Sequence, residues 1–148
     1  MPRTADFDRN DESPCRGMKL FFGKGRCGQC HGGSNFSDNK FHNAGLAPIK
    51  GQMPDLGKFK INEDEADKWV FKTPGLRSIN RTAPYMHDGR FKTLEEVIEF
   101  FDRGGDSVEN KSPLIKELGW TRQEKKDLEE FLIALEGESV STQFPLLP

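Results

Sequence analysis

Cys27-Gly28-Gln29-Cys30-His31 is the stretch that decides the fold of this 148-residue chain. The pattern C-x-x-C-H is the attachment sequence of a c-type haem. The two intervening residues let both thiols add to the vinyl groups of one porphyrin, and the histidine that follows offers an imidazole nitrogen to the iron. The motif predicts one covalent haem c, attached through Cys27 and Cys30, with His31 as the proximal iron ligand.

Two other kinds of site can be built on a C-x-x-C pair. A zinc site takes further cysteines or histidines, and the chain offers only Cys15, His42 and His87. A mixed zinc site of Cys27 and Cys30 with these histidines therefore stays open. A thioredoxin-like redox pair needs a βαβ setting, and no strand pattern flanks this motif. We expect Cys15 to be a buried free thiol, with an intermolecular contact as the alternative.

The composition suits one domain whose core forms around a cofactor. The hydrophobic fraction is only 34%, and the net charge is -2. This charge argues against a general nucleic-acid binder, and no apolar run is long enough to cross a bilayer. Residues 16–60 hold eight Lys/Arg and two Asp/Glu, whereas residues 95–138 hold six Lys/Arg and thirteen Asp/Glu. The basic segment either compensates the haem propionates or forms a docking face for an acidic redox partner.

The two ends of the chain predict a pair of crossing helices. A first helix over about 14–22 places Gly17 and Phe21 on one face. A capping box at Thr121 opens a last helix that ends at about Glu136. The glycine-then-aromatic pattern before C-x-x-C-H resembles the N-terminal helix of class I cytochromes c, over whose glycine a terminal helix crosses closely. This resemblance implies that the last helix crosses the first near Gly17. The apolar stripe of the last helix consists of Leu128, Phe131, Leu132 and Leu135.

Another helix begins at a capping box on Thr93 and ends near Gly104. Between His31 and this helix the chain is rich in Gly, Pro and Asn, so we expect mostly loop, with one short helix after an Asn62 cap. One face of the helix after Thr93 carries Leu94, Val97, Ile98 and Phe101.

The expected fold class is all-α, a class I cytochrome c-like domain with few helices and long loops that wrap the haem. We place this haem domain at residues 14–138. A flexible polar arm, residues 1–13, precedes it, and a C-terminal tail, residues 139–148, follows it.

From about Gly17 to Gly137 the chain resembles the C-terminal haem domain of the bacterial dihaem cytochrome c peroxidase and MauG family. In that family this domain holds the electron-transferring haem, and a separate N-terminal haem domain holds the peroxidatic site. The resemblance implies an electron-transfer role, and the single C-x-x-C-H motif implies one haem. The matching segments are 16–22, 27–33, 35–38, 41–43, 71–77, 82–89, 93–98 and 103–105.

The resemblance also implies further ligands. The family binds a calcium ion between its two domains, partly through backbone carbonyls that match Thr82 and Pro84. The sixth iron ligand of the family is Met in the peroxidases and Tyr in MauG-like members, and the matching residue here is Phe101, which has no lone pair. The haem is then five-coordinate under an apolar lid, or it takes a substitute ligand. Met86 is the best candidate by chemistry, although its family position is a packing one.

Other polar side chains are expected at the haem edge. Arg77 and Arg81 are candidate partners of the haem propionates through charge-assisted hydrogen bonds. We expect His42 and His87 to bond propionate or backbone groups rather than the iron.

These features favour a monohaem c-type electron-transfer protein that works with a redox partner protein or a second haem subunit. The alternative is a peroxidase-like haem enzyme subunit or a five-coordinate haem protein that binds small ligands, so whether the chain is an enzyme by itself stays open. Haem is attached to C-x-x-C-H outside the cytoplasm. We therefore expect a periplasmic or otherwise extracytoplasmic location, with a signal peptide that is not part of this sequence.

Overall fold

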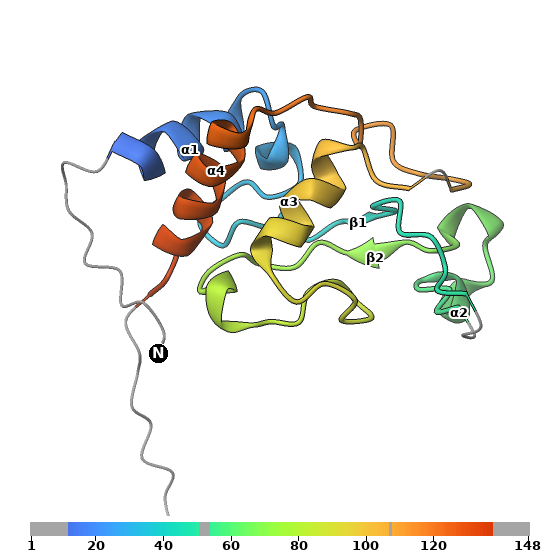
Figure 1. The fold of residues 1–148 in the computed structure, drawn as a ribbon. Helices are drawn as coiled ribbons and strands as arrows, with labels where there is room; N and C mark the ends of the chain where they lie inside the picture. Colours follow the sequence, from blue (N-terminus) through green and yellow to red (C-terminus); the bar gives the residue numbers. More distant parts are fainter. Residues whose placement is uncertain (1–11, 51–53, 107, 138–148) are drawn as a thin grey trace, which may run out of the picture.

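The computed structural model describes residues 12–50, 54–106 and 108–137. The predicted arm therefore overlaps the described residues only at positions 12 and 13, and the predicted tail lies outside them. None of the helices in the described ranges is long and apolar enough to span a bilayer. The helices are α1 (Glu12–Phe22), α2 (Phe59–Asn62), α3 (Leu94–Asp102) and α4 (Arg122–Ala134), with 3-10 turns η1 (Cys27–Gln29), η2 (Glu65–Asp67) and η3 (Ile79–Arg81), as Figure 1 shows.

The domain is mainly helical with few helices, as predicted, but it is not purely α-helical. Two strands of two residues each, β1 (Phe41–His42) and β2 (Phe71–Lys72), pair in an antiparallel sheet. The all-α expectation is corrected to this extent. Strands this short carry no periodic pattern that sequence reasoning can detect. The small sheet joins two distant parts of the long segment between η1 and α3 (Figure 1).

The short helices of this segment also differ from the prediction. Asn62 does not cap a helix; it ends α2, and its side chain accepts a hydrogen bond from the Asp64 N–H at 3.3 Å. Asp64 is the residue that caps η2, because its side chain accepts from the Ala66 N–H. Asn and Asp suit both caps and turns, so spacing alone selects the wrong one of two neighbouring candidates.

The first and last helices cross at Gly17, as predicted. A Cβ atom added at Gly17 would lie 1.9 Å from the Asp127 carbonyl oxygen and 2.7 Å from Phe131 Cβ, so no larger residue allows this approach. One turn further on, the ring centroids of Phe21 and Phe131 lie 5.2 Å apart. The crossing fixes the position of the chain that leads into Cys27.

A buried carboxylate, Asp127, stabilises this crossing, and it was not predicted from the sequence. Asp127 is only 3% exposed. It accepts hydrogen bonds from Arg16 Nε at 2.7 Å, from Ser13 Oγ at 2.6 Å and from the Gln123 amide at 2.9 Å. The hydrogen bonds from Arg16 hold the pKa of Asp127 down at about 2. Protein hydrogen-bond donors thus replace water around the negative charge of Asp127. Without such donors, burial of a carboxylate would be strongly unfavourable.

Both predicted capping boxes form. Thr93 caps α3 with Glu96, and Thr121 caps α4 with Glu124. In each box the threonine hydroxyl accepts from the glutamate N–H, and the glutamate carboxylate accepts from the threonine N–H. Each box satisfies amide groups that have no partner inside the helix and fixes where the helix begins.

The burial of α3 differs in one respect from the predicted apolar face. Leu94 and Ile98 are buried, and Phe101 is half-buried. The fully buried ring is Phe100, which packs against Phe91 with 5.5 Å between ring centroids. Consecutive helical residues point about 100° apart, so Phe100 and Phe101 serve different sides of α3.

Gly17→Ala is expected to destabilise the protein by about 1–3 kcal/mol, because the new methyl group overlaps the Asp127 carbonyl. Helix propensity alone predicts the opposite sign, a gain of about 1 kcal/mol. Cys15→Ala, at an exposed position of the same helix, is the control and should change stability by less than about 0.5 kcal/mol. Urea unfolding measures both variants. A Gly17→Ala protein as stable as the parent would contradict the close crossing.

Stability should fall with acid through Asp127. Its folded pKa, about 2, lies below the ordinary value of 3.8, so the unfolded state binds more protons between these values. The contribution, about 2 kcal/mol, is present above pH 4 and is lost as the pH falls toward 2. Urea midpoints measured from pH 6 to pH 2 should show a shallower acid limb for Asp127→Asn than for the parent. Glu63→Gln, at an exposed site, should keep the parental slope.

Candidate haem-attachment site

The turn that carries the two cysteines is tightly closed. Arg26 leads into η1 with a φ of 54°, in the left-handed region. The N–H groups of Cys30 and His31 both donate to the Cys27 carbonyl, at 3.2 and 2.8 Å. One short turn therefore carries both thiols and the histidine, as attachment to a single porphyrin requires.

Burial keeps the two thiols of the motif protonated. It raises the pKa of Cys27 to about 12, and Cys27 packs against the hydrophobic core. Burial also raises the pKa of Cys30, and the charge of Asp38 adds to this effect. Neither thiol has the lowered pKa that marks a reactive redox cysteine. Cys15 was predicted to be buried, but it is exposed on α1, so that expectation was wrong.

A backbone carbonyl positions His31. The Nδ1 atom of His31 lies 2.8 Å from the Phe36 carbonyl oxygen. The loop that brings this carbonyl back to the histidine is closed by a hydrogen bond of 2.7 Å from the Asp38 N–H to the Cys30 carbonyl. With Nδ1 donating, Nε2 keeps its lone pair. Burial lowers the pKa of His31, opposed in part by the Phe36 carbonyl, so the ring is neutral and can ligate a metal ion.

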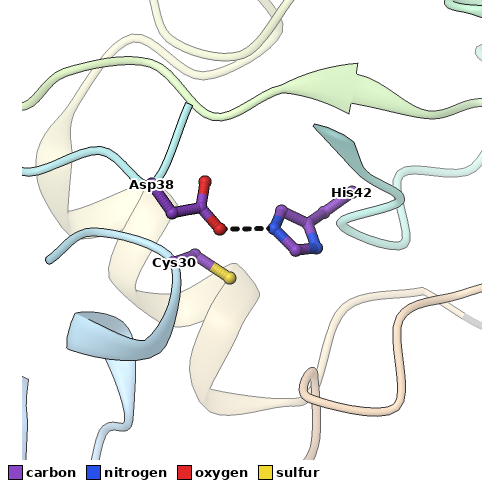
Figure 2. Close-up of side chains that lie close together, drawn as sticks. All are labelled: Cys30, Asp38 and His42. Atoms are coloured by element: carbon purple, nitrogen blue, oxygen red, sulfur yellow. Dashed lines mark hydrogen bonds and ion pairs between the residues drawn. The ribbon is translucent and has the colours of Figure 1, made fainter. Parts of the chain in front are cut away.

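Cys30, Asp38 and His42 lie side by side next to η1, as Figure 2 shows. One ligand atom of each lies within 4.8 Å of the others. Asp38 Oδ2 and His42 Nε2 are 2.8 Å apart. Burial tends to raise the pKa of Asp38, but the hydrogen bond from His42 prevails and the pKa is about 2. Asp38 was not predicted as a site residue, because an acidic residue four positions before a histidine is common on protein surfaces and indicates no particular site.

The mixed zinc site considered from the sequence is not assembled within the described residues. The one group of metal-ligating side chains there contains Cys30 and His42 but neither Cys27 nor His87. His87 instead stacks on the Phe71 ring, with 3.8 Å between centroids. A structural zinc ion takes four protein ligands, and this group supplies three.

The two arginines expected at the propionates have protein partners. Arg77 Nε donates to the Ser34 carbonyl at 2.8 Å, and its guanidinium lies 5.5 Å from the centroid of the Phe36 ring. Arg77 thus braces the loop that orients His31. Arg81 forms an ion pair with Glu136, close to the end of α4.

The remaining predicted site residues follow η3. Thr82 and Pro84 are exposed, and the Thr82 hydroxyl donates to the Ile79 carbonyl at 3.0 Å. Met86 is half-buried with a φ of 72°, in a turn closed by the hydrogen bond from the Tyr85 N–H to the Phe91 carbonyl at 2.7 Å.

Sequence reasoning also missed an aromatic neighbour of Cys27. A Cβ atom added at Gly25 would lie 2.8 Å from Trp120 Cζ2 and 3.3 Å from Cys27 Sγ, so the indole and the thiol flank the same glycine. Trp120 is buried, and its Nε1 has no hydrogen-bond partner among the described residues. No spacing rule connects a tryptophan before α4 with the motif after α1.

Comparison with known proteins finds cytochrome-c peroxidases and MauG proteins among the relatives of this chain. No family model matches the chain. It is 38% identical to the cytochrome-c peroxidase IdrP1 of Pseudomonas sp. (strain SCT), over 99% of this chain and 46% of the relative. It is 37% identical to the methylamine utilization protein MauG of Methylorubrum extorquens, over 97% of this chain and 42% of the relative.

A solved structure agrees with these relatives. The crystal structure of a MauG-like protein associated with microbial copper homeostasis matches with a TM-score of 0.80 and 38% identity, over 86% of this chain and 47% of that chain. The chain spans about half the length of the curated relatives it matches. Sequence and fold together make this chain a homologue of the cytochrome-c peroxidase and MauG family, matching about half of each of those proteins.

Proposed function

We propose that this chain is a c-type haem domain that transfers single electrons. One haem is attached through Cys27 and Cys30, and His31 is its proximal iron ligand. The hydrogen bond between His31 Nδ1 and the Phe36 carbonyl carries the proposal, because such a bond orients a ligating imidazole and raises its basicity. The relatives, named cytochrome-c peroxidase and MauG, support a haem-based role in electron transfer or peroxidase-like chemistry.

The surroundings of the motif fit a porphyrin. Phe21 lies 6.5 Å from the His31 ring and 6.1 Å from Phe36, measured between centroids, so aromatic rings line one side of the imidazole. This apolar wall keeps water from the side of the haem that His31 would bind. A haem bound here supplies an iron that gains or loses one electron without making or breaking a bond.

The second candidate function rests on α3. By the family resemblance, Phe101 covers the distal side of the haem, and its half-buried ring offers no lone pair. A five-coordinate iron would accept small ligands or peroxide, which is the peroxidase-like alternative. Met86 is the proposed substitute ligand, and it would restore the electron-transfer assignment.

The remaining assignments are part of the same proposal. Arg77 lies against the loop of His31, where its Nε donates to the Ser34 carbonyl, and from this position its guanidinium would meet a propionate. The backbone carbonyls of Thr82 and Pro84 are exposed candidates for a weak calcium site that another domain or chain would complete. The class I cytochrome c-like domain spans 14–138. It works outside the cytoplasm, in the periplasm or another extracytoplasmic compartment, with a redox partner protein or a second haem subunit.

Covalent attachment is tested by mass. Produced in a host that attaches c-type haem, the chain should exceed 16.8 kDa by one haem and keep that haem after denaturation. The double variant Cys27→Ser/Cys30→Ser should lose the covalent haem, whereas Cys15→Ser, the matched control, should retain it. Intact-mass spectrometry and absorption spectra measure both. A parent chain that carries zinc and no haem would contradict the proposal.

Phe101→Met should convert a five-coordinate ferric haem to a six-coordinate, low-spin form and raise its reduction potential, because thioether ligation favours ferrous iron. Phe100→Met is the matched control: its ring is fully buried between Phe91 and the Phe101 ring, so a thioether there points into the core and the spectrum should stay as in the parent. Absorption spectra and redox titration decide. If Phe101→Met changes nothing while Met86→Ala abolishes a low-spin band, Met86 is the ligand and the placement of α3 is wrong.

A further inference from the structure

A basic hollow opens at the surface beside the cysteine motif. Its volume is about 390 Å³, and it lies between the end of α1 and the segment that leads into α4. These two segments meet at the same edge of the molecule in Figure 1. The lining residues are Gly23, Lys24, Arg26, Lys116, Glu117 and Leu118.

Two cations of this hollow, Arg26 and Lys116, are available to a partner. Lys19 lies one turn before it on α1, where its carbonyl accepts from the Gly23 N–H at 2.8 Å. The side chains of all three are exposed, and within the described ranges none of them makes an ion pair or a hydrogen bond. Lys24 differs, because its Nζ bonds the Glu124 carboxylate at 2.8 Å and the Gly119 carbonyl at 3.1 Å. The protein as a whole is slightly acidic, whereas the lining of the hollow carries three cations, Lys24, Arg26 and Lys116, and one carboxylate, Glu117.

Exposed apolar side chains border the same cations. Phe22 is 54% exposed and Met18 is 44% exposed, and their four-residue spacing puts them on one face of α1. The Phe22 ring lies against the cysteine turn, since a Cβ atom added at Gly28 would lie 2.4 Å from Phe22 Cδ1. Aromatic residues and Met beside cations are typical of surfaces that bind proteins, whereas a small anion needs no apolar neighbour.

We propose that this docking surface, made of Met18, Lys19, Phe22, Arg26 and Lys116, binds the acidic face of a redox partner protein. The proposal rests on the proposed haem attachment, because Arg26 directly precedes Cys27 and Phe22 covers Gly28. A partner seated here stands over the edge at which the haem is bound. The partner is a one-electron donor: it is oxidised as the ferric haem is reduced, and no bond forms or breaks.

The test compares two double variants that each remove two positive charges. Arg26→Asn/Lys116→Gln acts on the docking surface, and asparagine suits the left-handed φ of residue 26. Lys72→Gln/Lys92→Gln is the matched control, on β2 and just before α3, away from the hollow (Figure 1). Stopped-flow measures the reduction of each ferric holo-protein by the hydroquinone of an acidic flavodoxin.

At low ionic strength the docking variant should react roughly three- to tenfold more slowly than the parent, and the control less than about twofold more slowly. The difference should vanish near 0.5 M salt, where the screening length is about 4 Å. Equal slowing of both variants would reduce the effect to net charge and overturn the proposal, as would an unchanged rate in the docking variant.

A binding measurement separates this proposal from haem attachment. Carbodiimide couples lysine amines to carboxylates, so cross-links between the parent protein and flavodoxin should map to Lys19 and Lys116 rather than to Lys72 and Lys92. A protein without haem would contradict the proposed function, and the cross-links would still decide the docking surface. Cross-links between two copies of this chain at Lys116 would identify a self-association surface instead and overturn the acidic-partner proposal.

Discussion

The close approach of α1 to α4 is the constraint on which the rest of the domain depends. Gly17 lets the two backbones touch, and the buried Asp127 carboxylate holds them in place through Arg16. Since η1 follows α1 after a short turn, the crossing sets where Cys27 meets the core. The same contact brings Trp120, at the entrance to α4, against the turn before Cys27. The proposed haem-binding edge is thus built where the first and last described helices meet.

Local signals made much of the fold predictable. The two capping boxes, at Thr93 and Thr121, and the apolar stripe of α4 are each formed by residues close together in the sequence. All three formed as predicted. The crossing at Gly17 was also predicted, because the glycine and the phenylalanine ahead of the cysteine motif resemble the N-terminal helix of class I cytochromes c. The C-x-x-C-H motif lies on a single turn, although its attachment to haem stays a prediction.

Features that depend on long-range backbone paths were not predictable. The strands β1 and β2 are too short for a periodic pattern, and Asn62 and Asp64 compete for the same cap. The burial of Asp127 follows from donors on α1, more than a hundred residues away in the sequence. The Asp38–His42 pair beside Cys30 depends on how a loop returns to the motif (Figure 2). The spacing of residues in a single sequence does not indicate which distant segments come into contact.

The group that orients His31 is a main-chain carbonyl, and every amino acid at position 36 supplies one. No substitution there can delete the acceptor; it can only alter the path of the loop, whose residue 36 has a φ of 51°. The length and the backbone conformation of a short loop, rather than a side chain, therefore determine the orientation of the His31 imidazole. A substitution at position 36 removes the ring that packs on Phe21 but leaves the acceptor, whereas the loss of one residue between His31 and Phe36 would move the acceptor out of register.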